Sequence, residues 1–211
     1  MRRTQIFNAT DLNPTRLMQL ARLLKEGALA AIPTDTVYGI ATGAFCEQSI
    51  TEIYQLKKRP SGQPLQLLMG NTDRVRQVAQ FSVQAEALAQ AYWPGALTLI
   101  LPPTQAGTAL LRGFEGLGIR VPATAFLQSL LSFLDVPLAC TSANEHGKPV
   151  ITNEQDLVEL VEGKVDFIIK AGALSPIPSS VVDLTNKPRL LREGALSKES
   201  LERVMGGLLI V

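Results

Sequence analysis

The sequence holds few of the residues from which the commonest catalytic sites are built. Its 211 residues include one histidine, His146, and two cysteines, Cys46 and Cys140. Two cysteines are too few for a disulfide framework and fit a reducing compartment, where we interpret both as small core residues. A zinc site of histidine and cysteine ligands would need more of both residues, so we predict no such metal site.

Three motifs of common enzyme classes are also missing from the sequence. No phosphate-binding G-x-x-x-x-G-K-[ST] loop occurs, because Gly147-Lys148 is followed by Pro149. The glycines of "GFEGLG" (113–118) have the wrong spacing for a dinucleotide fingerprint, and no G-x-S-x-G elbow is present. These absences argue against P-loop enzymes, dinucleotide-dependent enzymes and hydrolases with a Ser-His-Asp triad.

A large net charge and long apolar runs are missing as well. The chain has 20 basic and 19 acidic residues, and the net charge of +1 provides no overall field for attracting nucleic acid. No segment approaches the roughly 18 apolar residues of a membrane-spanning helix, and the first residues lack the apolar stretch of a signal peptide. We therefore expect a cytoplasmic protein without a membrane partner, whose anion binding would depend on the local placement of cations.

What the sequence does contain is an alternation of amphipathic helix patterns and short apolar strand patterns. Helices are predicted at 13–27, 47–56, 71–80, 82–93, 124–134, 153–163 and 197–206. Strands are predicted at 28–33, 65–69, 96–102, 116–122, 136–141 and 165–172, with an antiparallel pair at 179–185 and 189–194. Such an alternation predicts an α/β fold with a mixed sheet flanked by helices. No linker or repeat divides the chain, so residues 1–211 are predicted to form a single domain.

Polar residues gather where several of these apolar segments end. Strand ends of an α/β sheet are places where loops can bring polar groups together around a ligand. One further cation, Arg120, lies inside the apolar stretch "GIRVP". The clusters are Thr34-Asp35-Thr36 with Tyr38, Lys57-Lys58-Arg59-Pro60 with Gln63 and Pro64, Thr141-Ser142-Ala143-Asn144, and Ser179-Ser180 with Arg192-Glu193-Gly194.

Each cluster also has an explanation that involves no ligand. Basic residues 57–59 would complement the dipole at a helix C-terminus, residues 142–144 could form turn hydrogen bonds, and Arg192 could be solvated. Arg120 is harder to explain in this way, because a guanidinium between apolar neighbours needs an anionic partner if its strand is covered. The residues by themselves indicate an α/β pocket for an anion, with cations on one wall and hydroxyls on another.

Seven short segments, taken in their order along the chain, are more specific than any one of them alone. They are "PTDTVYG", "KKRPSGQPL", "WPGALTLIL", "GIRVP", "TSAN", "SSVVDLT" and "LLREGAL". In this order they resemble the YrdC family, the threonylcarbamoyl-AMP synthases, over about residues 14–205. The resemblance implies a twisted mixed sheet flanked by helices around a deep basic cavity.

The resemblance also implies an activity and its partners. Family members join L-threonine, bicarbonate and ATP into threonylcarbamoyl-AMP and release pyrophosphate, and we expect Mg²⁺ to accompany the ATP. A partner complex then transfers the threonylcarbamoyl group to tRNA, which makes tRNA an indirect partner. The chain resembles the short members of the family, which have no additional C-terminal domain.

The family's residues can be carried over to the matching positions of this chain. A carbamate and a triphosphate are both anions, so cations must neutralise them before the two can react. The resemblance implies that Lys57 and Arg59 hold the triphosphate as the catalytic residues, without a covalent nucleophile. It implies further nucleotide contacts from Gln63, Ser142, Asn144 and Arg192, and threonine contacts from Thr36, Arg120, Cys140 and Ser179.

Two positions depart from the family pattern and leave alternatives open. Leu68 stands where longer members have a histidine, and Val150 stands where many members have a serine. These differences leave room for a YciO-like paralogue whose reaction is not defined by the family pattern. A carbamoyl-adenylate former that acts on another acceptor is a separate alternative. A non-catalytic module that binds double-stranded RNA or tRNA through the same cavity is a third alternative, against which the small net charge argues.

Overall fold

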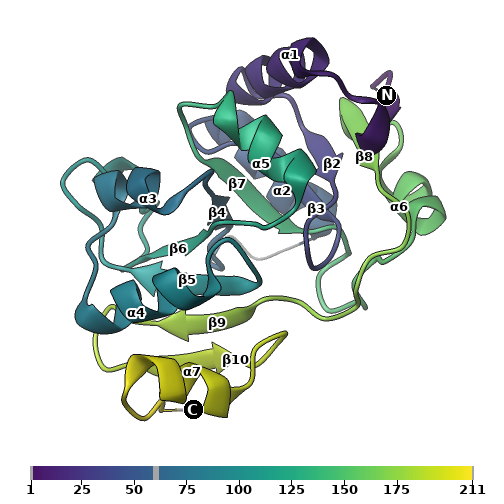
Figure 1. Ribbon diagram of the computed structural model, residues 1–211. Helices are drawn as coiled ribbons and strands as arrows, with labels where there is room; N and C mark the ends of the chain where they lie inside the picture. The colour runs from purple at the N-terminus through teal and green to yellow at the C-terminus, as the bar shows by residue number, and fades with distance from the viewer. Residues whose placement is uncertain (1, 59–61, 211) are drawn as a thin grey trace. The chain divides into compact units, whose positions relative to one another are not determined.

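The computed structural model describes residues 2–58 and 62–210, which form two compact units. Unit 1 consists of Met1–Leu65 and Thr124–Pro176, and unit 2 consists of Gln66–Ala123 and Ile177–Val211. Each unit contains mixed parallel and antiparallel strands with helices packed against them (Figure 1). The predicted α/β class with a mixed sheet and flanking helices is therefore confirmed, whereas the single domain and the basic cavity stay predictions.

The strands of unit 1 follow the order β1-β8-β2-β3-β7. Their bounds are β1 (Gln5–Asn8), β8 (Phe167–Lys170), β2 (Ala30–Ile32), β3 (Gly39–Gly43) and β7 (Leu138–Ser142). Strand β8 pairs in parallel with both β1 and β2, whereas β3 is antiparallel to β2 and to β7. The predicted strands 28–33, 136–141 and 165–172 correspond to β2, β7 and β8.

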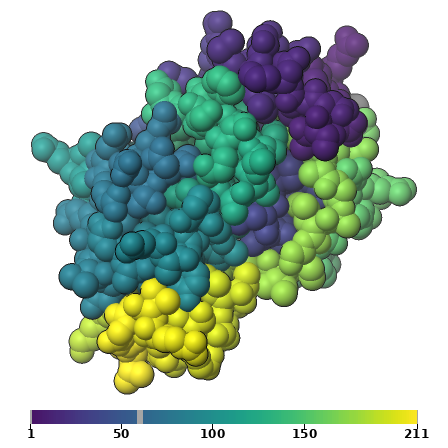
Figure 2. Space-filling view, viewed as in Figure 1, coloured from purple at the N-terminus to yellow at the C-terminus, as the bar shows by residue number. Residues whose placement is uncertain are grey.

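Helices cover both faces of this sheet. They are α1 (Pro14–Lys25), α2 (Glu47–Lys57), α5 (Ala125–Ser132) and α6 (Glu154–Val161), with a short 3₁₀ turn at Ala9–Asp11. Ile53 of α2 and Leu157 of α6 pack with Ile40 on one face. On the other face α1 lies so close to β3 that a Cβ on Gly43 would be 2.7 Å from the carbonyl oxygen of Leu24. Figures 1 and 2 show α1 and α5 beside each other at the surface of the unit.

The limits of α1 follow from its sequence. The side chain of Asn13 caps the helix by accepting a hydrogen bond from the main-chain nitrogen of Arg16, and Pro14 occupies the first turn. Gly27, at φ +102°, follows the last turn in a conformation that other residues adopt rarely. The cap, the first residue and the stop are those predicted from "NPTRLMQLARLLKEG".

The strands of unit 2 follow the order β4-β6-β5-β9-β10. Their bounds are β4 (Gln66–Leu68), β6 (Leu117–Arg120), β5 (Leu97–Leu101), β9 (Ser180–Asp183) and β10 (Arg189–Arg192). The helices are α3 (Thr72–Val78), α4 (Val83–Tyr92) and α7 (Lys198–Met205), with a 3₁₀ turn at Thr108–Leu110. Strands β9 and β10 form the predicted antiparallel pair. Beyond them, Ile210 exchanges main-chain hydrogen bonds with Pro188 and Leu190.

Two strands of unit 1 were not predicted from the sequence. Strand β1 has four residues that are mostly exposed, so it lacks an apolar pattern. Strand β3 begins and ends with glycine, which is rare in strands. The pairing with β7 explains Gly39, because a Cβ there would lie 2.6 Å from Sγ of Cys140.

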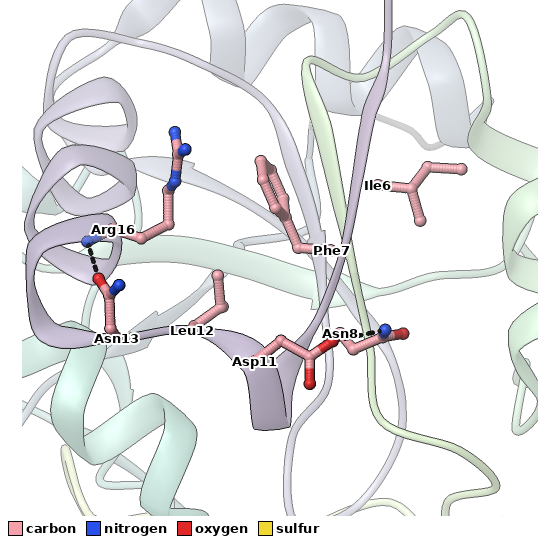
Figure 3. Close-up of a pocket in the computed structure, with 7 residues that line it drawn as sticks. All are labelled: Ile6, Phe7, Asn8, Asp11, Leu12, Asn13 and Arg16. Atoms are coloured by element: carbon pink, nitrogen blue, oxygen red, sulfur yellow. Dashed lines mark hydrogen bonds between the residues drawn. The ribbon is translucent and has the colours of Figure 1, made fainter.

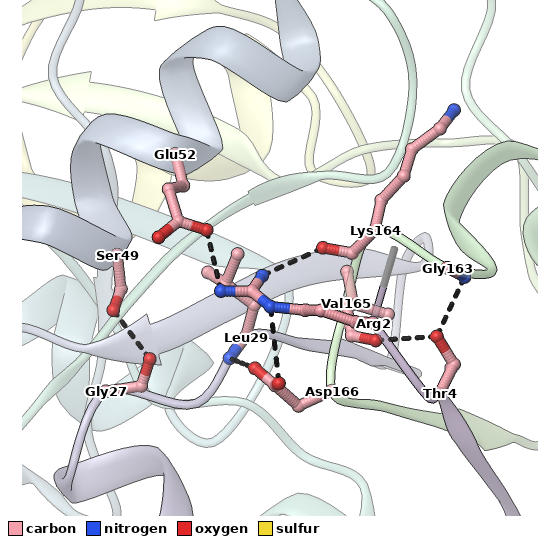
Figure 4. Close-up of polar contacts among 10 residues, drawn as sticks. All are labelled: Arg2, Thr4, Gly27, Leu29, Ser49, Glu52, Gly163, Lys164, Val165 and Asp166. Atoms are coloured by element: carbon pink, nitrogen blue, oxygen red, sulfur yellow. Dashed lines mark hydrogen bonds and ion pairs between the residues drawn. The ribbon is translucent and has the colours of Figure 1, made fainter.

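Arg2 ties the beginning of the chain to two other segments of unit 1, helix α2 and residues 164–166 (Figure 4). Its guanidinium contacts Glu52 Oε2 at 2.7 Å, Asp166 Oδ1 at 3.3 Å and the carbonyl oxygen of Lys164 at 2.9 Å. The second oxygen of Asp166 accepts a hydrogen bond of 2.8 Å from the main-chain nitrogen of Leu29. Asp166 thereby holds the segment that leads into β2 and the arginine that precedes β1.

We expect Asp166→Ala to lower the free energy of unfolding by about 1–3 kcal/mol, because it leaves the amide of buried Leu29 without its acceptor. Urea denaturation of the two proteins measures the difference. Asp135→Ala is the matched control, since Asp135 pairs with Lys25 at the surface and its loss should change stability by less than about 0.5 kcal/mol. Equal effects of the two substitutions would contradict the role given to Asp166.

Candidate functional site

The predicted site residues are divided between the two units. Unit 1 holds Thr36, Lys57, Gln63, Cys140, Ser142 and Asn144, and unit 2 holds Arg120, Ser179 and Arg192. Arg59, to which a triphosphate contact was assigned, lies outside the described residues. The structure supplies local geometry for the others.

Lys57 ends α2 with a buried side chain that is 2% exposed. Its ammonium donates hydrogen bonds to the carbonyl oxygens of Ser142 and Asn144, the latter at 2.6 Å, and lies 3.3 Å from Oδ1 of Asn144. A buried ammonium is stable only when oxygen atoms replace its water. The segment at the end of β7 supplies those oxygens, so Lys57 joins α2 to residues 142–144.

Ser142 and Asn144 complete this network. Ser142 Oγ donates to Asn144 Oδ1 at 2.5 Å, and Asn144 Nδ2 donates to the carbonyl oxygens of Glu145 at 3.0 Å and Lys148 at 2.7 Å. The amide of Asn144 thus accepts two and donates two hydrogen bonds, which is its full capacity. The turn hydrogen bonds that a ligand-free explanation requires are present, and nucleotide binding by the two residues stays a prediction.

The turn after β2 lies beside this network. Thr34 Oγ1 donates to the carbonyl oxygen of Val37 at 2.6 Å and lies 3.0 Å from the hydroxyl of buried Thr36. The antiparallel pairing of β3 and β7 then brings the turn to residues 142–144, because the main-chain nitrogen of Ala143 donates to the carbonyl oxygen of Tyr38 at 2.7 Å. Unit 1 therefore brings Thr36, Lys57 and residues 142–144 into one region.

The remaining predicted residues of unit 1 have mainly packing contacts. The hydroxyl of Tyr54 donates to the carbonyl oxygen of Gln63 at 2.8 Å, which attaches that residue to α2. Cys140 is buried against Gly39, as expected of a small core residue. The same interpretation is wrong for Cys46, which is only partly buried and lies 3.3 Å from the carbonyl oxygen of Lys25, because it stands at the surface end of α2.

The side chain of Tyr38 attaches the turn after β2 to residues 171 and 172. Its hydroxyl donates to the carbonyl oxygen of Gly172 at 2.7 Å and accepts from the nitrogen of Ala171 at 3.0 Å. Burial raises the pKa of the Tyr38 phenol, which keeps it protonated as a donor. Glu154 holds the same segment, because its carboxylate accepts from the nitrogen of Gly172 at 2.5 Å and pairs with Lys170 at 3.0 Å.

In unit 2, Ser179 is the centre of a second network. Its Oγ lies 2.8 Å from Oγ1 of Thr98, which in turn accepts a hydrogen bond from Nε2 of Gln66. Arg192 donates to the carbonyl oxygen of Ser179 at 2.9 Å and to its Oγ at 3.1 Å. The structure thus brings Ser179 and Arg192 together. It adds Gln66 and Thr98, which the sequence patterns did not select.

Arg120 is buried at the end of β6, with 2% of its surface exposed. Its Nε donates to the carbonyl oxygen of Gly95 at 3.0 Å. The register of β4 and β6 pairs Arg120 with Leu68, the position at which longer family members have a histidine. The buried cation of Arg120 is therefore paired with an apolar residue in the neighbouring strand.

Two cavities of unit 1 lie away from these residues. One of about 350 Å³ is lined by residues 6–8, 11–13 and 16, with the guanidinium of Arg16 5.7 Å from the ring centre of Phe7 (Figure 3). The other, of about 490 Å³, lies beside the segment around Arg2. Neither contains a predicted site residue, so neither enters the candidate site.

The described residues contain no helix long and apolar enough to cross a membrane. Within 2–58 and 62–210, no group of three or more His, Cys, Asp or Glu residues is arranged to hold a metal ion.

Comparison with known proteins identifies relatives of the chain. The family model Sua5_yciO_yrdC, described as "Telomere recombination", matches residues 22–194. A threonylcarbamoyl-AMP synthase of Pyrococcus abyssi is 35% identical over 194 residues, which cover 90% of this chain and 57% of the relative. The chain therefore spans little more than half the length of that protein.

Solved structures show the same fold. The crystal structure of P. abyssi Sua5 complexed with L-threonine matches 99% of this chain and 63% of that chain, with a TM-score of 0.90 and 33% identity. Escherichia coli YciO matches 95% of this chain and its own full length, with a TM-score of 0.85. At 24% identity, the likeness to YciO concerns the fold alone.

We expect Lys57→Met to loosen the segment after β7, because the carbonyl oxygens of Ser142 and Asn144 lose their charged donor. Hydrogen exchange of the amides at 143–148 should become at least about tenfold faster, while exchange in the core strands stays unchanged. Lys58→Met is the matched control, since the side chain of Lys58 is 75% exposed and pairs with Glu145 at the surface. Unchanged exchange in Lys57→Met would refute the ordering role.

A second prediction concerns pH. The amide of Gly172, and after it Lys170, hold the pKa of Glu154 below its ordinary value. A carboxyl group with a lowered folded-state pKa stabilises the fold above its unfolded pKa, and this contribution disappears as the pH falls through the folded value. Wild-type protein should therefore lose more stability between about pH 5 and pH 3 than Glu154→Gln does. Parallel pH dependence in denaturant titrations would count against the contact.

Proposed function

Because the chain belongs to the Sua5/YciO/YrdC family, we propose that it is an enzyme that forms threonylcarbamoyl-AMP. Its substrates are L-threonine, bicarbonate and ATP, and its second product is pyrophosphate. The observation that carries the proposal is the buried Lys57, which places a positive charge beside the ordered loop 142–148. The P. abyssi relatives, one of them complexed with L-threonine, support the same reaction.

The proposed chemistry has two steps. The threonine amine first adds to bicarbonate to give a carbamate with loss of water. A carbamate oxygen then attacks the α-phosphorus of ATP, and the bond to the β-phosphate bridging oxygen breaks to release pyrophosphate. Both reactants are anions, so catalysis consists of charge neutralisation and alignment rather than covalent attack by the protein.

The residues of unit 1 serve the nucleotide in this proposal. Lys57 stabilises the triphosphate through its charge and orders the loop that carries Ser142 and Asn144. Arg59 and Gln63 add phosphate contacts, and Thr36 contributes a hydroxyl toward threonine. A loop ordered by the hydrogen bonds of Asn144 suits this task, because a preorganised site does not reorganise during the reaction.

The residues of unit 2 serve mainly the amino acid. Arg120 pairs with the threonine carboxylate, since a guanidinium offers two parallel donors to a carboxylate. Ser179 hydrogen-bonds the amino acid, and Arg192 contacts the nucleotide. Cys140 contributes a further contact to threonine.

Mg²⁺ accompanies the nucleotide in this proposal. Phosphate oxygens and water are ligands that this ion prefers, and it neutralises part of the triphosphate charge. In this proposal the ion enters the site bound to ATP. The product passes in the cytoplasm to a complex that modifies tRNA, so RNA is an indirect partner.

Pyrophosphate release tests the proposal. We expect release by the wild-type protein to require ATP, L-threonine and bicarbonate together. Arg120→Lys should raise the KM for L-threonine by about tenfold or more and leave the KM for ATP within about twofold, because a lysine cannot make the paired contact. Lys57→Ala should abolish release, and surface Arg76→Gln is the control.

Different results would favour the alternatives. Folded protein that releases no pyrophosphate in any mixture, yet binds tRNA in a strongly salt-dependent way, would support an RNA-binding module. Release that occurs with another amine but not with L-threonine would indicate a carbamoyl-adenylate former with another acceptor.

A further inference from the structure

Thr98 lies on the same face of the unit 2 sheet as Arg120. Strands β5 and β6 are antiparallel and pair Leu99 with Ile119, so the residues next to this pair, Thr98 and Arg120, both point to the other face of the sheet. Residues opposite each other in neighbouring strands point to the same face. Thr98 also reaches Ser179, which precedes the adjacent strand β9. The hydroxyl of Thr98 therefore lies between two residues proposed to bind the amino acid.

This hydroxyl is unusual for its surroundings. Strand β5 is otherwise apolar, with the sequence Leu-Thr-Leu-Ile-Leu, and Thr98 is 4% exposed. Ser179 is similarly buried at 3%. A buried hydroxyl lowers stability unless it is hydrogen-bonded, and valine would fill the same volume without that requirement. A role for the oxygen explains why a threonine occupies this position.

The hydrogen bonds define a chain of four groups. Gln66 Nε2 donates to Thr98 Oγ1, and Arg192 Nη2 donates to Ser179 Oγ at 3.1 Å. Both ends of the chain are donors, and the two hydroxyls lie 2.8 Å apart between them. One hydrogen bond joins the hydroxyls, and it uses one of their two protons.

The second hydroxyl proton has no acceptor among the hydrogen bonds of residues 2–58 and 62–210, and either hydroxyl can be the donor in the bond that joins the two. Arg192 cannot take it, because a guanidinium only donates. When Thr98 receives from Gln66 and donates to Ser179, the remaining proton belongs to Ser179. Ser179 stands in the loop before β9.

We propose that Gln66 and Thr98 are positioning residues that orient Ser179 to donate its hydroxyl proton to an oxygen of the amino-acid substrate. The acceptor is a carboxylate or hydroxyl oxygen of a β-hydroxy amino acid. The inference rests on the proposed function, since it gives Ser179 a ligand of that reaction. Neither positioning residue touches the substrate; both act through the serine.

Removal of one oxygen tests the chain. Thr98→Val keeps the shape of the side chain, and we expect its affinity for L-threonine, measured by calorimetry, to fall about tenfold or more. Affinity for ATP should change by less than about twofold, and Thr98→Ser should restore most of the threonine affinity. Thr104→Val is the matched control, because Thr104 bonds a main-chain oxygen at the surface of the same unit.

Reversal of the chain is a second test. In Gln66→Glu a carboxylate replaces the donor, so Thr98 would donate to it, Ser179 would donate to Thr98, and no proton would remain for the substrate. We expect an equivalent loss of L-threonine affinity. The loss should be small when Thr98→Val is already present, because the chain is then broken. Gln80→Glu, at a residue that bonds the carbonyl oxygen of Pro103, is the control for added charge.

The outcomes separate this inference from the function on which it rests. Wild-type protein that neither binds L-threonine nor releases pyrophosphate would overturn the proposed function. An active wild type with unchanged threonine affinity in Thr98→Val would overturn the positioning role and leave the synthase proposal intact. An effect of Gln66→Glu that persists fully alongside Thr98→Val would mean simple charge repulsion and would also overturn it.

Discussion

A buried ammonium group constrains unit 1 more than any other single group. Lys57 is 2% exposed, and a charge in that position would destabilise the fold strongly without nearby oxygen atoms. Loop 142–148 supplies these atoms, because the carbonyl oxygens of Ser142 and Asn144 accept hydrogen bonds from the ammonium of Lys57. The side chain of Asn144 then holds the loop together by donating to the carbonyl oxygen of Lys148. The antiparallel pairing of β3 and β7 attaches this loop to the turn around Thr36, so the turn is held in place as well. The need to surround one buried charge with oxygen atoms thus orders helix α2, loop 142–148 and the turn around Thr36.

Unit 2 meets a related requirement. Arg120 and Arg192 donate to carbonyl and hydroxyl oxygens, so dipoles of the protein replace part of the water around both cations. This arrangement agrees with the small net charge of the chain, because local placement achieves what overall composition does not.

The sequence predicted the fold wherever local signals decide the outcome. Asn13, Pro14 and Gly27 bound α1 because capping and left-handed conformations depend on single residues. Strand β3 escaped prediction because its glycines make sense only beside Cys140, a contact between segments about 100 residues apart. Such a strand forms because it pairs with a neighbouring strand, and its own residues do not show which strand that is.

The same distinction explains the candidate site. Lys57, Ser142 and Asn144 were selected because they belong to motifs, although their mutual contacts join positions 85 and 87 residues apart. Thr98 and Gln66 belong to apolar strand patterns, in which a single threonine or glutamine carries no signal. Their partners lie 81 and 32 residues away along the chain, so only the folded sheet distinguishes them.

Residues near Ile210 have a protective effect that concerns association rather than catalysis. The outer strand of a sheet offers free main-chain groups to any extended segment, including one from another copy of the same protein. By bonding Pro188 and Leu190, Ile210 occupies groups that β10 would otherwise present. Ile210 therefore leaves fewer main-chain groups at the start of β10 open to the addition of another strand.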